Sequence, residues 1–187
     1  MIWLPNALTI ARTVAIVPIA VLLYWPAPEA RWIALLLFVA ACVTDFLDGW
    51  LARRWKATTV LGRLLDPIAD KVLVGALIVM LVGTGDAPAI PAMLIIFREL
   101  LVSGLREHLA GRAVVLPVTQ LAKWKTTVQM VALGFLMPGP YGPALTERVS
   151  THDIGEVLFW FAAVLTVVTG WTYLVASVQR MRNEPMP

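Results

Sequence analysis

Six long apolar runs are the feature that most constrains how this chain can fold. Of its 187 residues, 59% are hydrophobic and 14% are charged, whereas roughly a quarter of the residues of soluble domains are charged. A bilayer core about 30 Å thick requires about 20 mostly apolar residues per helix, so the runs can be counted directly. They cover residues 7–25, 30–53, 66–82, 88–110, 118–137 and 154–180. The sequence therefore predicts an all-α integral membrane protein with six transmembrane helices. No linker or repeat divides it, so we predict one domain over residues 1–187.

The positions of Lys and Arg predict the orientation, because cytoplasmic loops carry these residues in excess. They cluster after the second and fourth runs and in the tail, at Arg53, Arg54, Lys56, Arg63, Arg106, Arg112, Lys123, Lys125, Arg180 and Arg182. The opposite connections hold only Arg31 and Arg148. Both termini are therefore expected in the cytoplasm. The net charge of +3 then reflects orientation and contact with anionic lipids or substrates, and it does not predict nucleic-acid binding.

Four aspartates interrupt this apolar pattern, at Asp45, Asp48, Asp66 and Asp70. A carboxylate within a span costs roughly 2.5–3.5 kcal/mol on insertion scales, so four of them require a compensating charge. The first two share one helical face with Ala52, and the last two share one with Gly62 if that helix extends back so far. The short connection makes the two helices antiparallel neighbours, so we expect the four carboxylates to converge at the cytoplasmic surface.

Carboxylate oxygens are the ligands that Mg²⁺ and Mn²⁺ prefer, which predicts a site for one of these metals with room for two ions. Two ions can clamp a pyrophosphate and orient an attacking hydroxyl. The alternative is that the carboxylates form salt bridges with neighbouring cations, including Arg53 and Lys71. Salt bridges would explain a single aspartate. They explain less well four aspartates at these intervals with small residues between them.

The run from Asp45 to Asp70 resembles the CDP-alcohol phosphotransferase signature at all eight of its defining positions. These are Asp45, Asp48, Gly49, Ala52, Arg53, Gly62, Asp66 and Asp70. The resemblance implies six transmembrane helices, a homodimer and transfer of a phosphatidyl group from CDP-diacylglycerol to an alcohol, with release of CMP. It also implies that the four aspartates bind the metals, that Asp70 is the general base, and that Gly49, Ala52, Arg53 and Gly62 contact the CDP portion. Thr44 is expected either to touch the cytidine or to bond a backbone carbonyl.

Three further segments are similar to bacterial phosphatidylglycerophosphate synthases: residues 5–12, 97–107 and 123–130. This similarity implies sn-glycerol 3-phosphate as the acceptor and a multi-pass protein of the bacterial cytoplasmic membrane whose site faces the cytoplasm. The expected partners of the acceptor phosphate are Arg106, Lys123, Lys125 and Arg98. The excess of positive charge in cytoplasmic loops and contact with anionic lipids would also explain Arg106, Lys123 and Lys125 without a role in acceptor binding. Arg98 and Glu99 lie in mid-span, where they either join helices or reach the acceptor.

Two other interpretations remain. The same chemistry could use inositol phosphate or phosphatidylglycerol as the acceptor. A divalent-cation transporter would also hold carboxylates in its spans, but it predicts carboxylates near mid-membrane and two related halves, which this sequence lacks.

Overall fold

The computed structural model describes the backbone of residues 3–55, 60–110 and 119–183, and the side chains of residues 11, 13–45, 71–109 and 119–180. Six helices account for most of it. They are α1 (Trp3–Tyr24), α2 (Pro28–Trp55), α3 (Val60–Gly83), α4 (Ala89–Ala110), α5 (Gln120–Leu136) and α6 (Thr151–Asn183). The six predicted helices are therefore confirmed as helices. The largest difference is at α3, which begins six residues before the predicted start, so that Gly62, Asp66 and Asp70 all belong to one helix.

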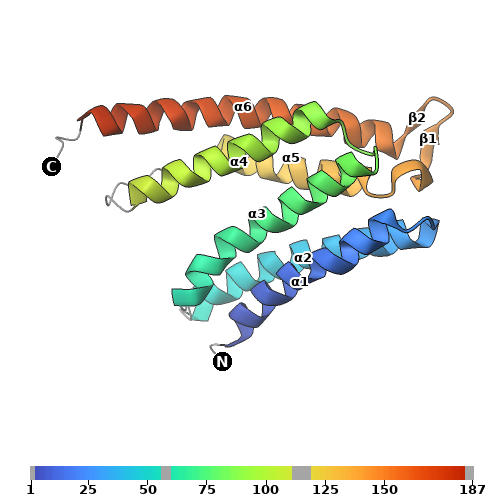
Figure 1. The fold of residues 1–187 in the computed structure, drawn as a ribbon, viewed down its shortest axis with the longest axis horizontal. Helices are drawn as coiled ribbons and strands as arrows, with labels where there is room; N and C mark the ends of the chain where they lie inside the picture. Colours follow the sequence, from blue (N-terminus) through green and yellow to red (C-terminus); the bar gives the residue numbers. More distant parts are fainter. Residues whose placement is uncertain (1–2, 56–59, 111–118, 184–187) are drawn as a thin grey trace.

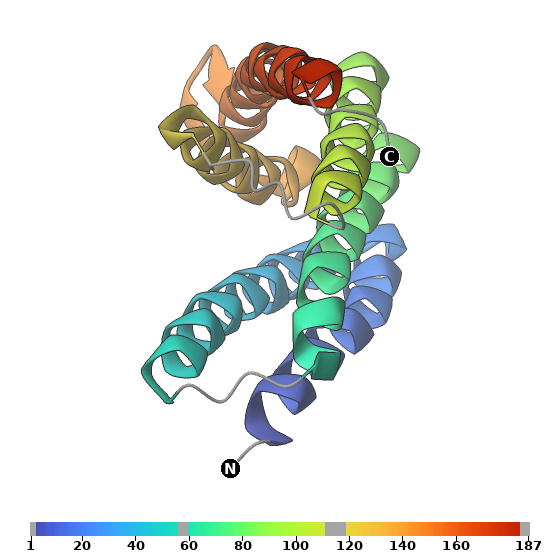
Figure 2. The same cartoon turned by 90° about the vertical axis from the view of Figure 1, so that its left-hand side faces the viewer.

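The helices form two groups that meet along α3, as Figures 1 and 2 show. In one group α1 packs against α2 and α3, and in the other α6 packs against α4 and α5. The groups are joined by contacts of α3 with α4 and α5, and of α2 with α5. Both groups contribute to one apolar core, which includes Leu23, Phe38, Ile78, Leu133 and Phe159. The carboxyl end of α2, the amino end of α3 and the carboxyl ends of α4 and α6 lie toward the same end of the molecule in Figure 1.

The outer surface of the bundle is apolar as well as its core. Leu36, Phe97 and Val157 are each about two-thirds exposed, and they lie on three different helices. Soluble monomers rarely expose large contiguous apolar patches. Within the part of the chain that the structure describes, one helix is long and apolar enough to cross a membrane, over Thr151–Arg180, and shorter apolar helices cover Thr13–Tyr24 and Lys71–Gly83.

A small hairpin that the sequence did not predict connects α5 to α6. After the 3₁₀ helix η1 (Gly139–Tyr141), strand β1 (Ala144–Thr146) pairs antiparallel with β2 (Val149–Ser150). Ser150 then caps α6, because its hydroxyl accepts a bond from Asp153 N (3.2 Å) while the Asp153 carboxylate accepts one from Ser150 N (2.7 Å). This reciprocal pair is a capping box, which fixes where α6 begins.

Arg31 and Asp86 form a buried ion pair at the same end as the hairpin, which changes the reading of Arg31 as a loop charge. Arg31 Nη1 donates to Asp86 Oδ2 at 2.6 Å and to the Met137 carbonyl at 3.3 Å. The Thr84 hydroxyl donates to the same carboxylate. Gly139 has a positive φ of 56°, and a Cβ there would lie 2.6 Å from Asp86 Oδ1. The pair therefore joins α2, the α3–α4 turn and the end of α5, and it requires glycine at position 139.

Replacing Arg31 with methionine is expected to destabilise the protein by about 3–5 kcal/mol, because it leaves the Asp86 carboxylate buried without its cation. Thermal or denaturant unfolding in detergent measures this. The matched control is Arg148→Met in the exposed hairpin, which should stay within about 0.5 kcal/mol of the parent. The double variant Arg31→Met with Asp86→Leu removes both charges, and it should lose less unfolding free energy than Arg31→Met alone. Equal stability of the Arg31→Met and Arg148→Met variants would contradict this role.

Candidate functional site

On α2 and on α3, an aspartate position lies on the same helical face as a residue that is buried in the core. Ala41 on α2 and Val74 on α3 are buried. Asp45 follows Ala41 by four residues, and Asp70 precedes Val74 by four, so each aspartate lies on the same helical face as its buried neighbour. Asp45 itself is exposed. Both helix backbones are continuous through the eight-position pattern.

Most of the predicted metal and nucleotide ligands have side chains outside the described residues. These are Asp48, Gly49, Ala52, Arg53, Gly62, Asp66 and Asp70, so their roles stay predictions. Among the described side chains, which include Asp45 but not the other three aspartates, no group of three or more His, Cys, Asp or Glu residues could hold a metal ion. The Thr44 hydroxyl donates to the carbonyls of Ala40 (2.6 Å) and Ala41 (3.0 Å). It thus makes the expected backbone bond, and its contact with the cytidine stays a prediction.

A cavity of 80 Å³ lies between α3, α4 and α5 and adjoins the aspartate face of α3. Val74 and Ile78 line it, and Asp70 and Asp66 precede Val74 on α3 by one and two turns. The polar residues of its wall are Lys71, Glu99, Lys125, Thr126 and Gln129. By helical periodicity, the cavity therefore lies on the same face of α3 as positions 66 and 70.

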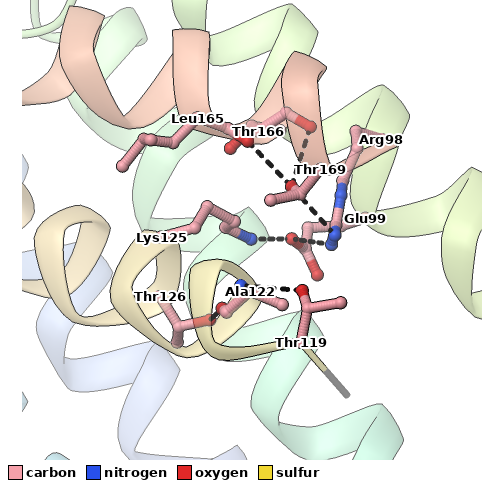
Figure 3. A network of polar contacts seen from close by, with 9 residues as sticks. All are labelled: Arg98, Glu99, Thr119, Ala122, Lys125, Thr126, Leu165, Thr166 and Thr169. Atoms are coloured by element: carbon pink, nitrogen blue, oxygen red, sulfur yellow. Dashed lines mark hydrogen bonds and ion pairs between the residues drawn. The ribbon is translucent and has the colours of Figure 1, made fainter. Parts of the chain in front are cut away.

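Glu99 is the centre of a network of polar contacts beside this cavity, drawn in Figure 3. Its carboxylate Oε1 accepts from Lys125 Nζ and from Arg98 Nη1 (3.2 Å). Arg98 Nη2 also donates to Thr169 Oγ1 on α6 at 3.2 Å, and its guanidinium lies 5.7 Å from the centre of the Tyr173 ring, a cation–π distance. The network thus links α4, α5 and α6, which confirms that Arg98 and Glu99 join helices.

Gly170 on α6 makes room for the Arg98 side chain. A Cβ at this position would lie 2.8 Å from Arg98 Cγ, which is closer than atoms of real side chains approach. Arg98 is only 9% exposed, and its Nε has no hydrogen-bond partner among the described residues. A buried donor without a partner is costly. Arg98 therefore keeps donor capacity beyond its structural contacts.

The structure does not bring the four predicted phosphate-binding cations together. Lys125 is 2% exposed and lies in α5 beside Glu99, whereas Lys123 and Arg106 are exposed. Residues two apart on a helix point to opposite sides, so Lys123 and Lys125 cannot share the cavity. Lys125 lines the cavity, whereas Arg98 is connected to it only through Glu99. The roles of all four cations toward a phosphate stay predictions.

Two cavity residues were not predicted as part of the site. Lys71 follows Asp70 directly and lines the cavity, although the sequence suggested it only as a salt-bridge partner. Gln129 is buried, and its Oε1 has no hydrogen-bond partner in the described part of the chain. Gln129 stands four residues after Lys125, so a helical projection of α5 would have placed both on one face. Gln129 is far from the aspartates in sequence, which hides its connection with them.

The described charges beside the cavity favour an anionic ligand. Lys71 and Lys125 are two cations of its wall, against the single carboxylate of Glu99, and Arg98 contacts that carboxylate as a third cation. Ammonium and guanidinium groups in a partly dehydrated site bind phosphate oxygens through charge-assisted hydrogen bonds. Magnesium also prefers carboxylates together with substrate phosphate oxygens. The charges of the described residues therefore suit a ligand that carries a phosphate group.

Comparison with known proteins gives a consistent result over nearly the whole chain. The family model described as CDP-alcohol phosphatidyltransferase matches residues 2–168. A relative from Rickettsia bellii is 49% identical over 92% of this chain and 94% of its own length. One from Cereibacter sphaeroides is 40% identical over 98% of this chain and all of its own length, and one from Haemophilus influenzae is 44% identical over 91% of each. All three are named CDP-diacylglycerol–glycerol-3-phosphate 3-phosphatidyltransferase.

Proposed function

Because the chain belongs to the CDP-alcohol phosphatidyltransferase family, a family of membrane enzymes of phospholipid synthesis, we propose that it transfers the phosphatidyl group of CDP-diacylglycerol to sn-glycerol 3-phosphate. The products are phosphatidylglycerophosphate and CMP. The observation that carries this proposal is the 40–49% identity, over nearly the full length, to relatives named for this activity. The cavity beside the aspartates supports a phosphate-bearing acceptor.

The reaction requires a hydroxyl oxygen to attack phosphorus while the bond to CMP breaks. The 1-hydroxyl of glycerol 3-phosphate forms the new P–O bond, its proton passes to the carboxylate of Asp70, and CMP leaves with the electrons of the broken bond. Gly49, Ala52, Arg53 and Gly62 contact the CDP portion, and Thr44 lies beside it.

The carboxylates of Asp45, Asp48, Asp66 and Asp70 form a hard oxygen donor set that fits two Mg²⁺ or Mn²⁺ ions. Bound there, the metal would neutralise charge on the leaving phosphate and orient the hydroxyl. Both helices that carry these residues are continuous through the pattern, which supports the assignment because the spacing then places each pair on one helical face.

The acceptor phosphate binds Lys125 and Lys71 in the cavity between α3, α4 and α5, and Arg98 reaches it from beside Glu99. Arg98 and Lys125 are already oriented by Glu99, so little side-chain freedom is lost when the phosphate arrives. Arg106 and Lys123 stand on the exposed surface, where they attract the anion toward the cavity.

All six helices span the membrane, with the aspartate end in the cytoplasm. The large apolar side chains exposed on α2, α4 and α6 support this placement, as does the shared position of the basic helix ends in Figure 1. We place the protein in the bacterial cytoplasmic membrane as a homodimer that contacts membrane lipids.

An acceptor panel tests the reaction. Purified protein with CDP-diacylglycerol and Mg²⁺ or Mn²⁺ is offered glycerol 3-phosphate, inositol phosphate or phosphatidylglycerol, while CMP release and the lipid product are measured together. Glycerol 3-phosphate should give phosphatidylglycerophosphate, and the other acceptors should give rates at least about tenfold lower, since a site built for one polar acceptor rejects poor matches. Product from another acceptor alone would refute the choice of glycerol 3-phosphate.

A further inference from the structure

A buried hydrogen-bond acceptor without a partner lies in the wall of the polar cavity between α3, α4 and α5. Gln129 on α5 lines this cavity and is 3% exposed. Its side-chain carbonyl oxygen Oε1 has no hydrogen-bond partner among the described residues. Buried polar atoms are nearly always hydrogen-bonded, so each exception requires an explanation. A ligand in the cavity would provide one, because the volume of 80 Å³ exceeds the roughly 10–15 Å³ that a single water needs.

Neighbouring polar groups of the wall are engaged elsewhere. Lys125 Nζ contacts the Glu99 carboxylate, and the Thr126 hydroxyl donates to the Ala122 carbonyl at 3.2 Å. Neither bond involves Gln129. Its Oε1 is therefore available to a donor that comes from a ligand.

The charged residues of the wall and Gln129 stand at different depths. In Figure 1, α5 runs toward the hairpin end of the molecule. Gln129 follows Lys125 by four residues, about 6 Å at 1.5 Å per residue, so it stands further from the aspartate end. On α4, which runs the opposite way, the lining residue one turn deeper than Glu99 is the apolar Ile95. The cavity thus has a charged outer level, and Gln129 lies at a deeper level with an apolar neighbour.

The missing partner must be a hydrogen-bond donor that is compatible with a nearby phosphate. An ionised phosphate offers acceptor oxygens and no donor, so it cannot bind Gln129 Oε1. A hydroxyl can donate to this oxygen. The amide is neutral, so it accepts the bond without repelling the phosphate, whereas a second carboxylate beside Glu99 would repel it. The wall therefore suits a ligand that carries both a phosphate and a hydroxyl.

We infer that Gln129 binds the 2-hydroxyl of sn-glycerol 3-phosphate and makes the enzyme select for it. This inference rests on the proposed function, in which the 1-hydroxyl attacks phosphorus and the phosphate binds the cations, so that the 2-hydroxyl is left for Gln129. The 2-hydroxyl lies between the other two groups. Holding it fixes the direction in which the 1-hydroxyl points, and orientation has a large effect on rate. Gln129 is thus a specificity-determining residue and takes no part in proton transfer.

The analogue 3-hydroxypropyl phosphate, which lacks only the 2-hydroxyl, tests this role. In the parent its kcat/KM should be about 100-fold or more below that of glycerol 3-phosphate, because the analogue leaves Gln129 Oε1 unpaired. Gln129→Met removes the carbonyl at nearly the same length. Its kcat/KM for glycerol 3-phosphate should fall about tenfold or more, and that for the analogue should stay within about threefold of the parent, since no buried oxygen is then left unpaired.

Gln120→Met is the matched control, because Gln120 is an exposed glutamine at the start of the same helix. It should behave as the parent with both substrates, and melting temperature in detergent shows that each variant is folded. Equal use of both substrates by the parent, or unchanged selectivity in Gln129→Met, would overturn the inference. Equal losses with both substrates in Gln129→Met would also overturn it, by assigning Gln129 a purely structural role.

Gly75→Leu tests whether glycerol 3-phosphate enters the cavity at all. Gly75 lines the cavity, and a Cβ there would have no atom within 4 Å, so leucine occupies open space. The KM for glycerol 3-phosphate should rise about tenfold or more, because the side chain takes the place of the substrate. Gly104→Leu should leave it unchanged, since Gly104 is equally open but lies on the exposed surface of α4.

The same KM in Gly75→Leu as in the parent would overturn the inference. A parent that is inactive with CDP-diacylglycerol, Mg²⁺ and glycerol 3-phosphate would refute the proposed function itself. An active parent whose selectivity does not depend on Gln129 would overturn only the role of this residue.

Discussion

Asp70→Asn is expected to lower kcat by about 10²- to 10⁴-fold, the range that a positioned general base contributes. The amide keeps the size of the carboxylate and one oxygen for a cation, but it cannot accept the proton of the attacking hydroxyl at neutral pH. CMP release under saturating donor and acceptor measures the loss. Binding of CDP-diacylglycerol should be partly retained, because three of the four predicted metal ligands remain.

Asp153→Asn is the matched control for this change. Asp153 is an exposed carboxylate in the first turn of α6, at the hairpin end, and the asparagine side chain can still accept the bond from Ser150 N. Its kcat should equal that of the parent. Near-normal turnover in Asp70→Asn would exclude Asp70 as the base. Recovery of Asp70→Asn at high Mg²⁺ would also exclude it, by showing that the loss reflects weaker metal binding alone.

Lys125→Met is expected to raise the KM for glycerol 3-phosphate about 10- to 100-fold. A hydrogen bond to a charged group contributes roughly 1.5–3 kcal/mol, and each 1.4 kcal/mol is a factor of ten in affinity. Methionine has nearly the length of lysine but no charge, so the packing of α5 is largely kept. The KM for CDP-diacylglycerol should change little, which assigns the loss to the acceptor.

Lys123→Met provides the comparison for Lys125→Met, since the two lysines are two residues apart on α5 but only Lys125 is buried. Lys123→Met should change KM less than about threefold and should respond to salt, because exposed charges act through screened attraction. A larger effect at Lys123 than at Lys125 would place the acceptor phosphate on the outer face of α5. Both variants should also be tested for stability, since Lys125→Met removes one of the two cations that contact Glu99.

The sequence was sufficient for the features that depend on local spacing. Runs of apolar residues predicted all six helices, because helix length and hydrophobicity are properties of contiguous segments. The eight-position pattern from Asp45 to Asp70 pointed to the family for the same reason. The hairpin between α5 and α6 was missed, since strands of two and three residues are too short to show alternation.

What the sequence by itself determined is the number of helices, the spacing that puts each pair of aspartates on one helical face, and the resemblance to a family, which implies the donor chemistry. Only the tertiary structure decided which charges are buried. Arg31 looked like a loop charge until Asp86, 55 residues away, was found beside it. Lys125 and Lys123 looked equivalent until Glu99 from α4 was found against only one of them. The polar cavity between α3, α4 and α5 likewise exists only between helices. The physical reason is that helix periodicity arises within a segment, whereas the pairing of a buried charge depends on contacts between segments far apart in the chain.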